Sequence, residues 1–520
     1  MMQKKIQLLD ANKRLSESLL WQFQRDYFEQ QGVEAWKQSV PFYVTSNPYI
    51  AHSYAKMAIS FIRDYVAKYP DSKQHPFYVI ELGTGSGCFS YYALKYMKEL
   101  IDNFNLQDVK IKYVMTDFTE NNLSFWRQQE KLVKFVEEGL LDFAIFNMEI
   151  DNQINLTESG QVLTKGSVKN PITVFANYIF DTVSHDCFKI KDGKIEEALV
   201  SLHAPAVDYV NNKLKTFDNL KVEFSTRAAD DNYYADSNFN KVLQYFKKRL
   251  NNTYMLFPLA GIKTIKNLLQ LNSKMLLVSS DKAYSSVEQL DYLGEPGISF
   301  HGSFSLMVNY SAIGEYFKCL GGEALLQVPR QGLDTFLGVS GMSLQDFPNL
   351  AYEANHYVSE MSPSHYFLMY RKTITNIDSH DTATLASNMC FAKWDPHVFK
   401  RMIQKLCKEA DSADKISMNY FAQNMDKIAD NFYFMPGCHD IMFDIGLFCY
   451  YSKHYNKALQ YFKKSEKYFG DKFNLRYNMA LTLYYLKEYD KSLEAFETAL
   501  RYDSSSKSVK DWIKHIKKNH

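Results

Sequence analysis

The chain has 520 residues, 46% of them hydrophobic, which is enough for two or three domains with ordinary buried cores. Its 60 basic and 59 acidic residues give a net charge of +1, which excludes the basic footprint of a nucleic-acid-binding domain. No apolar run approaches the length of a membrane span or of a signal-peptide core. The seven cysteines include no Cys-x-x-Cys pair, and no metal site is predicted, so a protein of the reducing cytoplasm is expected.

Two helical segments are predicted ahead of the first strand. The lead-in at residues 11–38 has apolar residues at helix-like spacing, namely Leu19, Leu20, Phe23, Tyr27 and Phe28. The turn Ser46-Asn47-Pro48 precedes a second helix with an apolar side made of Tyr54, Met57, Ala58, Phe61 and Ile62.

Residues 77–94, FYVIELGTGSGCFSYYAL, have the order strand, glycine turn, helix. The apolar run 77–80 is long enough for one buried strand, and the amphipathic run 89–100 is typical of a helix. Glycines at alternate positions of the turn permit a sharp bend and a close approach of the backbone to a ligand. This order is how an α/β sheet holds a nucleotide-like ligand, and a glycine-rich turn without a ligand is the alternative.

Details of this turn exclude some classes of nucleotide-like ligand. The dinucleotide pattern Gly-x-Gly-x-x-Gly would need a glycine where Cys88 stands, and Asp117 lies 30 residues after Gly87 instead of about 20. A phosphate loop would need Gly-Lys-Ser/Thr, which is absent. The remaining pattern, Glu-x-Gly-x-Gly-x-Gly, resembles motif I of class I S-adenosylmethionine (SAM) methyltransferases. The resemblance implies cofactor contacts from Glu81, Gly83, Thr84, Gly85 and Gly87.

Two further strands are predicted to end in polar residues beside the cofactor. Strand 111–118 ends at Asp117, whose carboxylate accepts hydrogen bonds from both ribose hydroxyls or, alternatively, caps the next helix. Strand 141–149 ends near Asn147 and Met148, which are expected to border the adenine or to be an ordinary strand end.

The fourth strand, within 171–183, leads out through Asn177, Tyr178 and Asp181. Because ligands lie outside the carboxyl ends of parallel strands, these residues are expected to face the methyl group and are the catalytic candidates. A turn asparagine and a capping aspartate are the alternative. Beyond them we expect a hairpin at 187–195, a mixed and helical region at 205–270, a strand at 274–284, a helix at 310–320 and a strand at 324–328.

Several of these segments resemble the MidA-like family of class I methyltransferases, which includes the mitochondrial complex I assembly methyltransferase. TSNPYIAHSYAKMAISFI is similar to the stretch before the first strand, and VFANYIFDTV to the family's A-N-E-x-x-D-x-x-P at Ala176, Asn177 and Asp181. SFSLMVNYSAIGEYFKCLGG and FLGVSG are similar to its late segments. The likeness covers about residues 15–345. It implies a class I (Rossmann-like) α/β fold, SAM as cofactor, and protein arginine as the target of the mitochondrial member.

The chain departs from this family on the substrate side. Ser46 and Asn47 are the candidate substrate residues. Pro41-Phe42-Tyr43 stands where the family has Gly-Asp-Phe, Asn47-Pro48 stands where it has Pro-Glu, and Tyr178 replaces the glutamate of A-N-E. Because arginine stays protonated at ordinary pH, an enzyme that methylates it needs carboxylates to hold the cation. The carboxylates left near the predicted site are Glu81, Asp181 and Glu149, so SAM is better supported by the sequence than arginine.

Residues 440–506 contain an internal repeat of 34 residues, in which Tyr455 matches Tyr489 and Phe462 matches Phe496. This period and its small and aromatic positions are the tetratricopeptide (TPR) pattern, which predicts an all-α domain that docks a protein. A structural lid is the alternative.

Four segments are thus predicted: a helical lead-in at 1–70, a SAM-dependent methyltransferase domain at 71–345, a helical connector at 346–437 and TPR-like repeats at 438–520. The favoured function is methylation of a protein side chain, with the repeats docking the substrate or a partner. The alternative is a methyltransferase fold that binds SAM weakly or not at all and serves as a TPR scaffold. A small-molecule or nucleic-acid methyltransferase is a third, weaker option.

Overall fold

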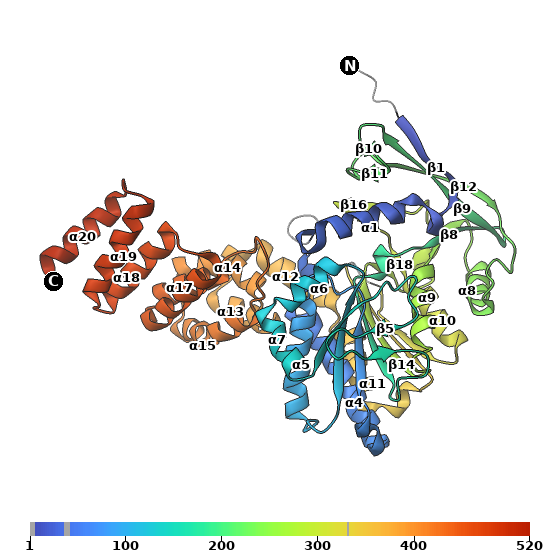
Figure 1. The fold of residues 1–520 in the computed structure, drawn as a ribbon, viewed down its shortest axis with the longest axis horizontal. Helices are drawn as coiled ribbons and strands as arrows, with labels where there is room; N and C mark the ends of the chain where they lie inside the picture. Colours follow the sequence, from blue (N-terminus) through green and yellow to red (C-terminus); the bar gives the residue numbers. More distant parts are fainter. Residues whose placement is uncertain (1–5, 36–41, 330–331) are drawn as a thin grey trace. The chain divides into compact units, whose positions relative to one another are not determined.

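The computed structural model describes residues 6–35, 42–329 and 332–520 (Figure 1). The chain divides into two compact units, Met1–Phe367 and Leu368–His520. The predicted boundaries after residues 70, 345 and 437 do not coincide with this division. The reason is that the helices just before the first strand and just after residue 345 pack on the α/β core of unit 1.

A seven-stranded sheet lies at the centre of unit 1. Its strand order is β19 (Glu323–Leu326), β20 (Asp334–Ser340), β14 (Met275–Asp281), β7 (Ile172–Asn177), β2 (Phe77–Glu81), β3 (Ile111–Asp117) and β4 (Leu141–Ile145). The five strands from β14 to β4 are parallel, and β20 runs antiparallel to both of its neighbours. Every residue of β2 is buried, as expected for a strand covered on both faces.

Helices cover both faces of this sheet (Figure 1). On one face lie α4 (Pro48–Lys68) and α5 (Cys88–Asn103), where the ring of Tyr54 on α4 packs edge-on against Phe175 of β7 with centroids 5.0 Å apart. On the other lie α8 (Ser237–Lys247), α9 (Leu259–Leu268) and α10 (Tyr310–Cys319), in one apolar cluster with Val174 and Leu277. The predicted strands at 77–80 and 274–284 and the predicted helix at 310–320 are confirmed.

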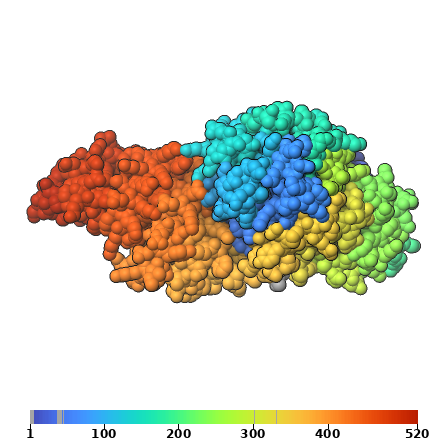
Figure 2. All heavy atoms as spheres, turned by 90° about the horizontal axis from the view of Figure 1, so that it is seen from below, coloured from blue at the N-terminus to red at the C-terminus, as the bar shows by residue number. Residues whose placement is uncertain are grey.

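In unit 1, the helix before the first strand of the seven-stranded sheet contacts a helix that follows the last strand of that sheet. The helix α4 begins where the side-chain oxygen of Asn47 accepts a hydrogen bond from the Ile50 N–H at 3.1 Å, with Pro48 at the first helical position. Near the other end of α4, Asp64 accepts from the Leu350 N–H of α11 (Pro348–Asn355) at 3.0 Å. The corresponding blue and yellow segments are adjacent in Figure 2.

A second, antiparallel sheet borders the first. It consists of β1 (Ile6–Arg14), β9 (Lys194–Pro205), β8 (Asp186–Lys191) and β13 (Thr253–Phe257), with β12 (Lys221–Ala228) on the other edge of β9. The predicted hairpin at 187–195 is confirmed as β8 and β9, and its turn takes Asp192 and Gly193 at φ values of +50° and +68°. The helix α1 (Leu19–Gln31) packs on this sheet through Leu20, Trp21 and Phe23.

The prediction of a continuous helical lead-in over 11–38 is wrong at its start. Residues 11–14 belong to β1, whose partner strand β9 lies almost two hundred residues further along the chain. Pairing with so distant a strand overrides local preference, and no local pattern shows it. The helix itself begins only after Ser18, whose hydroxyl caps it by accepting from the Leu20 N–H at 3.2 Å. Residues 36–41 of the predicted lead-in lie outside the described residues.

Unit 2 is helical. Its main helices are α13 (Thr382–Phe391), α14 (Pro396–Lys408), α15 (Lys415–Asn431), α16 (Ile441–Tyr451), α17 (Tyr455–Phe469), α18 (Phe473–Tyr485), α19 (Tyr489–Tyr502) and α20 (Lys507–Asn519). The helices α17 and α19 begin 34 residues apart, at Tyr455 and Tyr489, in agreement with the repeat length in the sequence. None of the helices in the described ranges has the length and apolar character needed to cross a membrane.

Candidate functional site

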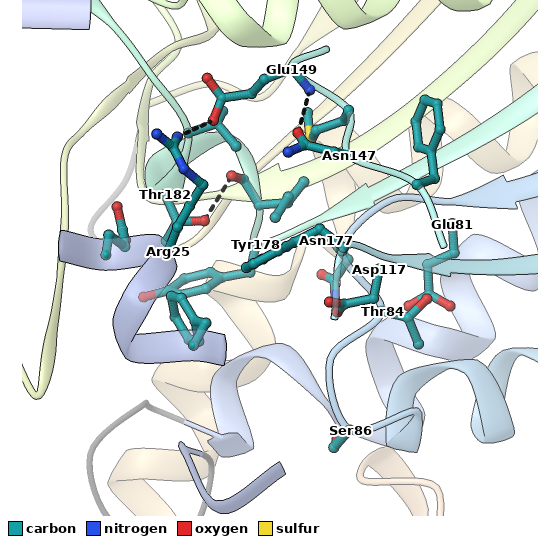
Figure 3. Close-up of a pocket in the computed structure, with 18 of the residues that line it drawn as sticks. Arg25, Glu81, Thr84, Ser86, Asp117, Asn147, Glu149, Asn177, Tyr178 and Thr182 are labelled. Atoms are coloured by element: carbon teal, nitrogen blue, oxygen red, sulfur yellow. Dashed lines mark hydrogen bonds and ion pairs between the residues drawn. The ribbon is translucent and has the colours of Figure 1, made fainter. Parts of the chain in front are cut away.

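A cavity of about 1180 Å³, counted with its opening to solvent, lies at the carboxyl ends of the parallel strands (Figure 3). Four segments line it on the side of the sheet: the glycine turn after β2, the residues after β3, those after β4, and the exit of β7. The helix α1 and Ser303, at the start of strand β17 (Ser303–Ser305), complete the wall. This is the edge of the sheet at which a parallel α/β fold binds its ligand.

The three predicted glycines adopt the left-handed backbone conformation, with φ values of +60° for Gly83, +61° for Gly85 and +81° for Gly87. At Gly83 space is restricted as well, because an added Cβ would lie 2.4 Å from Cδ1 of Ile179. Glycine is therefore required here both by the turn and by the close approach of the segment after β7.

Asp117 fixes the glycine turn in place. One carboxylate oxygen accepts from the Gly85 N–H at 3.0 Å, and the other accepts from the N–H and hydroxyl of Thr119, both at 3.0 Å. Asp117 is not the cap of the following helix α6 (Glu120–Arg127), because the cap position is Thr119. Burial raises the pKa of Asp117. A carboxylate has about four acceptor positions, so it retains capacity for a ligand hydroxyl from the cavity that it lines.

Glu81 lines the same end of the cavity, and hydrogen bonds from two buried hydroxyl groups fix its carboxylate. One of its carboxylate oxygens accepts from the hydroxyls of Ser90 and Tyr113, the latter at 2.8 Å. Burial raises the pKa of Glu81 to about 7. Thr84 also lines this end, and its N–H donates to the Thr116 carbonyl at 2.8 Å. Of the predicted cofactor residues of the turn, Glu81, Gly83 and Thr84 line the cavity together with Asp117, whereas Gly85 and Gly87 are not among the lining residues.

Asn147 and Met148 line the cavity beyond β4, which ends at Ile145. The side-chain oxygen of Asn147 accepts from the Glu149 N–H at 3.1 Å, so it stabilises a turn and is not directed at a ligand amine. Two aromatic residues that the sequence prediction missed, Phe118 and Phe146, also line this part. Each directly follows a strand, which is the signal that could have identified them.

The predicted catalytic residues follow β7, and only two of the three line the cavity. Asn177 and Tyr178 line the cavity, and Tyr178 has a φ of +57°, an unusual value for a residue with a side chain. Its N–H donates to the Ser280 carbonyl at 2.8 Å, which holds this conformation. Asp181 is fully buried and is not among the cavity-lining residues.

Asp181 lies instead beside a second buried carboxylate, Asp281, which accepts from the Asp181 N–H at 3.2 Å. Burial raises the pKa of Asp181 to about 7 and that of Asp281 well above its ordinary value. Neither oxygen of Asp181 has a hydrogen-bond partner among the described residues. Asp181 therefore has no path to a bound ligand in this structure, in contrast to its predicted place at the methyl group.

The two predicted substrate residues also differ in position. Ser46 lines the cavity. Asn47 is fully buried outside the lining, where it caps α4 and its amide donates to the Tyr43 carbonyl at 3.1 Å. Asn47 thus has a structural role.

The side of the cavity opposite the glycine turn is built by Glu149, which the sequence places near the site, and by residues that sequence reasoning missed. Arg25 and Phe28 come from α1, Glu149 and Thr182 also line this side, and Figure 3 shows Arg25 next to Glu149. The guanidinium of Arg25 lies 3.5 Å from the Glu149 carboxylate, which also accepts from the Ser184 hydroxyl. No local pattern marks Arg25 and Phe28 as site residues, because α1 precedes the α/β core and joins the site only through the fold.

The residues at the glycine end fit SAM. The backbone of the turn leaves room for a ligand, two carboxyl groups can interact with its hydroxyl, amino or sulfonium groups, and no lysine or arginine in the described lining stands beside them to repel the cation (Figure 3). The one basic lining residue in the described part of the chain, Arg25, lies at the other end with Glu149.

Comparison with known proteins agrees with this geometry. Residues 58–310, slightly less than half of the chain, match a family model described as "Putative S-adenosyl-L-methionine-dependent methyltransferase". No curated protein matches the chain.

Solved structures resemble the chain at low identity. An uncharacterized protein from Burkholderia thailandensis has 11% identity and a TM-score of 0.35, over 63% of this chain and 96% of its own. A candidate methyl transferase from the same organism, bound to S-adenosylhomocysteine, has 12% identity and a TM-score of 0.34, over 59% and 80%. Loganic acid methyltransferase has 12% identity and a TM-score of 0.19, over 54% and 58%. With its glycine turn, buried carboxylates and family match, the chain is a SAM-dependent methyltransferase whose cofactor is SAM.

Proposed function

We propose that the chain is a class I methyltransferase that modifies a protein side chain, and that the helices of unit 2 dock the substrate or a partner protein. The observation that carries the proposal is the hydrogen bond that holds the glycine turn to Asp117 at one end of the cavity. The same cavity continues to a second, separate polar region. One end suits a cofactor and the other a methyl acceptor. The strand order, with one antiparallel strand second from the edge, supports the class I assignment.

The cofactor would lie along Glu81, Gly83, Thr84, Gly85, Gly87 and Asp117, with Met148, Phe118 and Phe146 at its adenine end. SAM supplies a methyl group already activated on a sulfonium, so the protein has to align the acceptor and exclude water. Asn177 and Tyr178 lie between the two ends of the cavity in Figure 3, which suits them to align the acceptor with the methyl group.

The core of unit 2 supports a TPR-type repeat. Residues that match at the 34-residue period are buried in both copies: Gly446 and Ala480, Ala458 and Ser492, Phe462 and Phe496, Ser465 and Ala499. These positions form the contacts between paired helices, so equivalent residues of the two sequence repeats pack in the same way.

A docking surface for protein is supported by exposed tyrosines at matching positions of the two repeats. Tyr451 at the end of α16 is 48% exposed, and Tyr485 at the end of α18 is 46% exposed. Tyrosine is enriched in protein interfaces because its ring and hydroxyl contact apolar and polar groups at low entropic cost. A cytoplasmic location is proposed on the composition, with seven scattered cysteines and no disulfide framework.

The test is transfer of a radiolabelled methyl group from SAM to a total protein extract by the full chain. We expect label in protein, and we expect Tyr451→Ser with Tyr485→Ser to reduce it while calorimetry shows unchanged SAM affinity. The matched control is Tyr352→Ser, which replaces a tyrosine that is 72% exposed in unit 1. Label confined to small molecules would overturn the protein substrate, and equal labelling by the double variant would overturn the docking role.

A further inference from the structure

We infer that the methyl acceptor is an uncharged polar side chain, and that Gln24 and Ser303 determine this specificity by hydrogen bonding to it. The inference rests on the proposed function, since it names the chemical class of the protein side chain that enters the site. It is carried by polar groups at the acceptor end of the cavity that are buried and lack hydrogen-bond partners among the described residues.

Gln24 offers the cavity a hydrogen-bond acceptor. The residue is 2% exposed, and its amide nitrogen donates to the Phe304 carbonyl at 2.7 Å. Because a carbonyl can only accept, this contact fixes which end of the amide is the nitrogen. The residue lines the cavity, and its amide oxygen is buried with no partner among the described residues. A buried amide oxygen without a partner is costly, so its place in the wall of a binding cavity points to a ligand N–H or O–H.

Ser303 lies beside it on β17, next to the residue that Gln24 contacts. The side chain is fully buried, lines the cavity, and has no hydrogen-bond partner for its hydroxyl in the described part of the chain. The hydroxyl of Tyr178 is a third such group in the same lining, and burial raises its pKa, so it stays protonated. One acceptor and two hydroxyls, each able to donate or accept, suit a neutral group that both donates and accepts.

The charges around this end disfavour a cationic acceptor. Arg25 and Glu149 pair with each other, so the one carboxylate of the described lining at this end is already compensated. The ammonium of Lys282 lies 5.5 Å from the centre of the Tyr178 ring and adds a positive charge behind it. Asp181, the acid predicted to face the methyl group, is buried outside the lining. A guanidinium or ammonium group would therefore lose its water without gaining a free carboxylate.

The transfer is balanced without a further reagent. The acceptor heteroatom forms a bond to the methyl carbon as the sulfur–methyl bond breaks, and the electron pair of that bond stays on sulfur. The neutral acceptor loses one proton, which leaves through the opening of the cavity to solvent. The hydrogen bond from the acceptor to Gln24 orients its lone pair toward the methyl group and draws electron density onto the reacting atom.

The test uses the full chain, tritiated SAM and a total protein extract freed of small molecules, with the methylated residues identified by mass spectrometry. Gln24→Glu and Ser303→Ala are compared with Gln22→Glu, an exposed position on the same helix, and Ser299→Ala, an exposed position on the preceding strand. We expect label on uncharged side chains, a loss of about tenfold in transfer for Gln24→Glu and Ser303→Ala, and SAM affinity within about threefold of wild type in all variants. Gln24→Glu should also shift the residual label toward lysine or arginine, which a merely structural role would not do.

Label on arginine, lysine or a carboxylate of the wild-type reaction would overturn the inference and leave the proposed function standing. No label in protein, with SAM binding intact, would overturn the proposed function and the inference with it. Transfer by Gln24→Glu and Ser303→Ala equal to that of their controls would overturn the role of these two residues.

Discussion

The N–H of Gly85 donates a hydrogen bond of 3.0 Å to the carboxylate of Asp117, so the end of β3 holds the turn after β2. The two residues are 32 positions apart in the chain and meet because their strands are neighbours in the parallel sheet. The cofactor end of the cavity is therefore one rigid unit, in which the shape of the turn depends on the charge of the neighbouring strand end.

Asp117→Asn tests this relationship. The amide would present an N–H group or a weaker acceptor to Gly85 and Thr119, and it would contact a ribose hydroxyl less favourably. We expect the SAM dissociation constant to rise by about 10- to 100-fold, which corresponds to roughly 1.4–2.8 kcal/mol. The measurement is calorimetric titration, with Asp102→Asn at an exposed position as control. An unchanged dissociation constant would place the ribose elsewhere.

Gly83→Ala is expected to lower both stability and SAM affinity. The new Cβ would clash with the Ile179 side chain at 2.4 Å and force a left-handed backbone on alanine. The cost should be about 2–4 kcal/mol, against about 1 kcal/mol for Gly139→Ala, which has a similar φ of +74° but no atom within 4 Å. Denaturant unfolding measures both, and Ile179→Ala added to Gly83→Ala should restore part of the loss. Equal effects at the two glycines would contradict the packing argument.

The buried pair of Asp181 and Asp281 predicts a pH dependence of stability. Since the pKa of Asp181 is raised to about 7 in the folded state, the folded protein binds a proton more tightly than the unfolded chain. Stability should therefore fall as pH rises from about 4 to about 7 and level off above. Asp181→Asn removes this group, so it should stabilise the protein at about pH 8 by on the order of 1–3 kcal/mol and have a smaller effect at about pH 5.

Thermal unfolding across this pH range shows whether Asp181→Asn raises or lowers the stability of the protein. The SAM affinity of the variant should stay unchanged, because the side chain lies outside the cavity lining. A variant that is less stable than wild type at the higher pH would contradict the assignment of Asp181 as a destabilising buried acid. Loss of SAM binding in a folded variant would contradict its placement.

In unit 2, Gly446→Ala tests the packing of the first repeat. Helix propensity alone would make this change stabilising by about 1 kcal/mol. The added Cβ would lie 2.5 Å from the fully buried ring of Phe462, however, so we expect a net loss of about 1–2 kcal/mol. Denaturant unfolding of the full chain, followed by a probe in unit 2, measures the change. A gain in stability would show that Phe462 moves aside freely.

Local features of the sequence were sufficient to predict that the glycine turn and Asp117 lie together at one edge of the sheet. The glycines and Asp117 lie at strand ends that hydrophobic patterning locates, and their spacing in the chain determines how they meet. The repeat in unit 2 was visible for the same reason, since Tyr455 and Tyr489 begin equivalent helices.

The acceptor end could not be predicted in this way. Gln24 reaches the site because α1 packs against Phe304, 280 residues away, and nothing in the local pattern indicates that contact. The strand β1 depends on an equally distant partner. The sequence showed that an acid follows β7 at Asp181, but it could not show where the side chain points. The turn at Tyr178 directs that side chain into the core and not toward the cavity.

The central claim is that SAM binds at the glycine turn, and calorimetric titration of the full chain with SAM tests it most directly. We predict one SAM per chain at protein concentrations of about 100 μM or below, and no binding by Gly85→Arg, which places a long side chain on the turn. Absence of heat for the wild-type chain, or unchanged affinity in Gly85→Arg, would contradict the account.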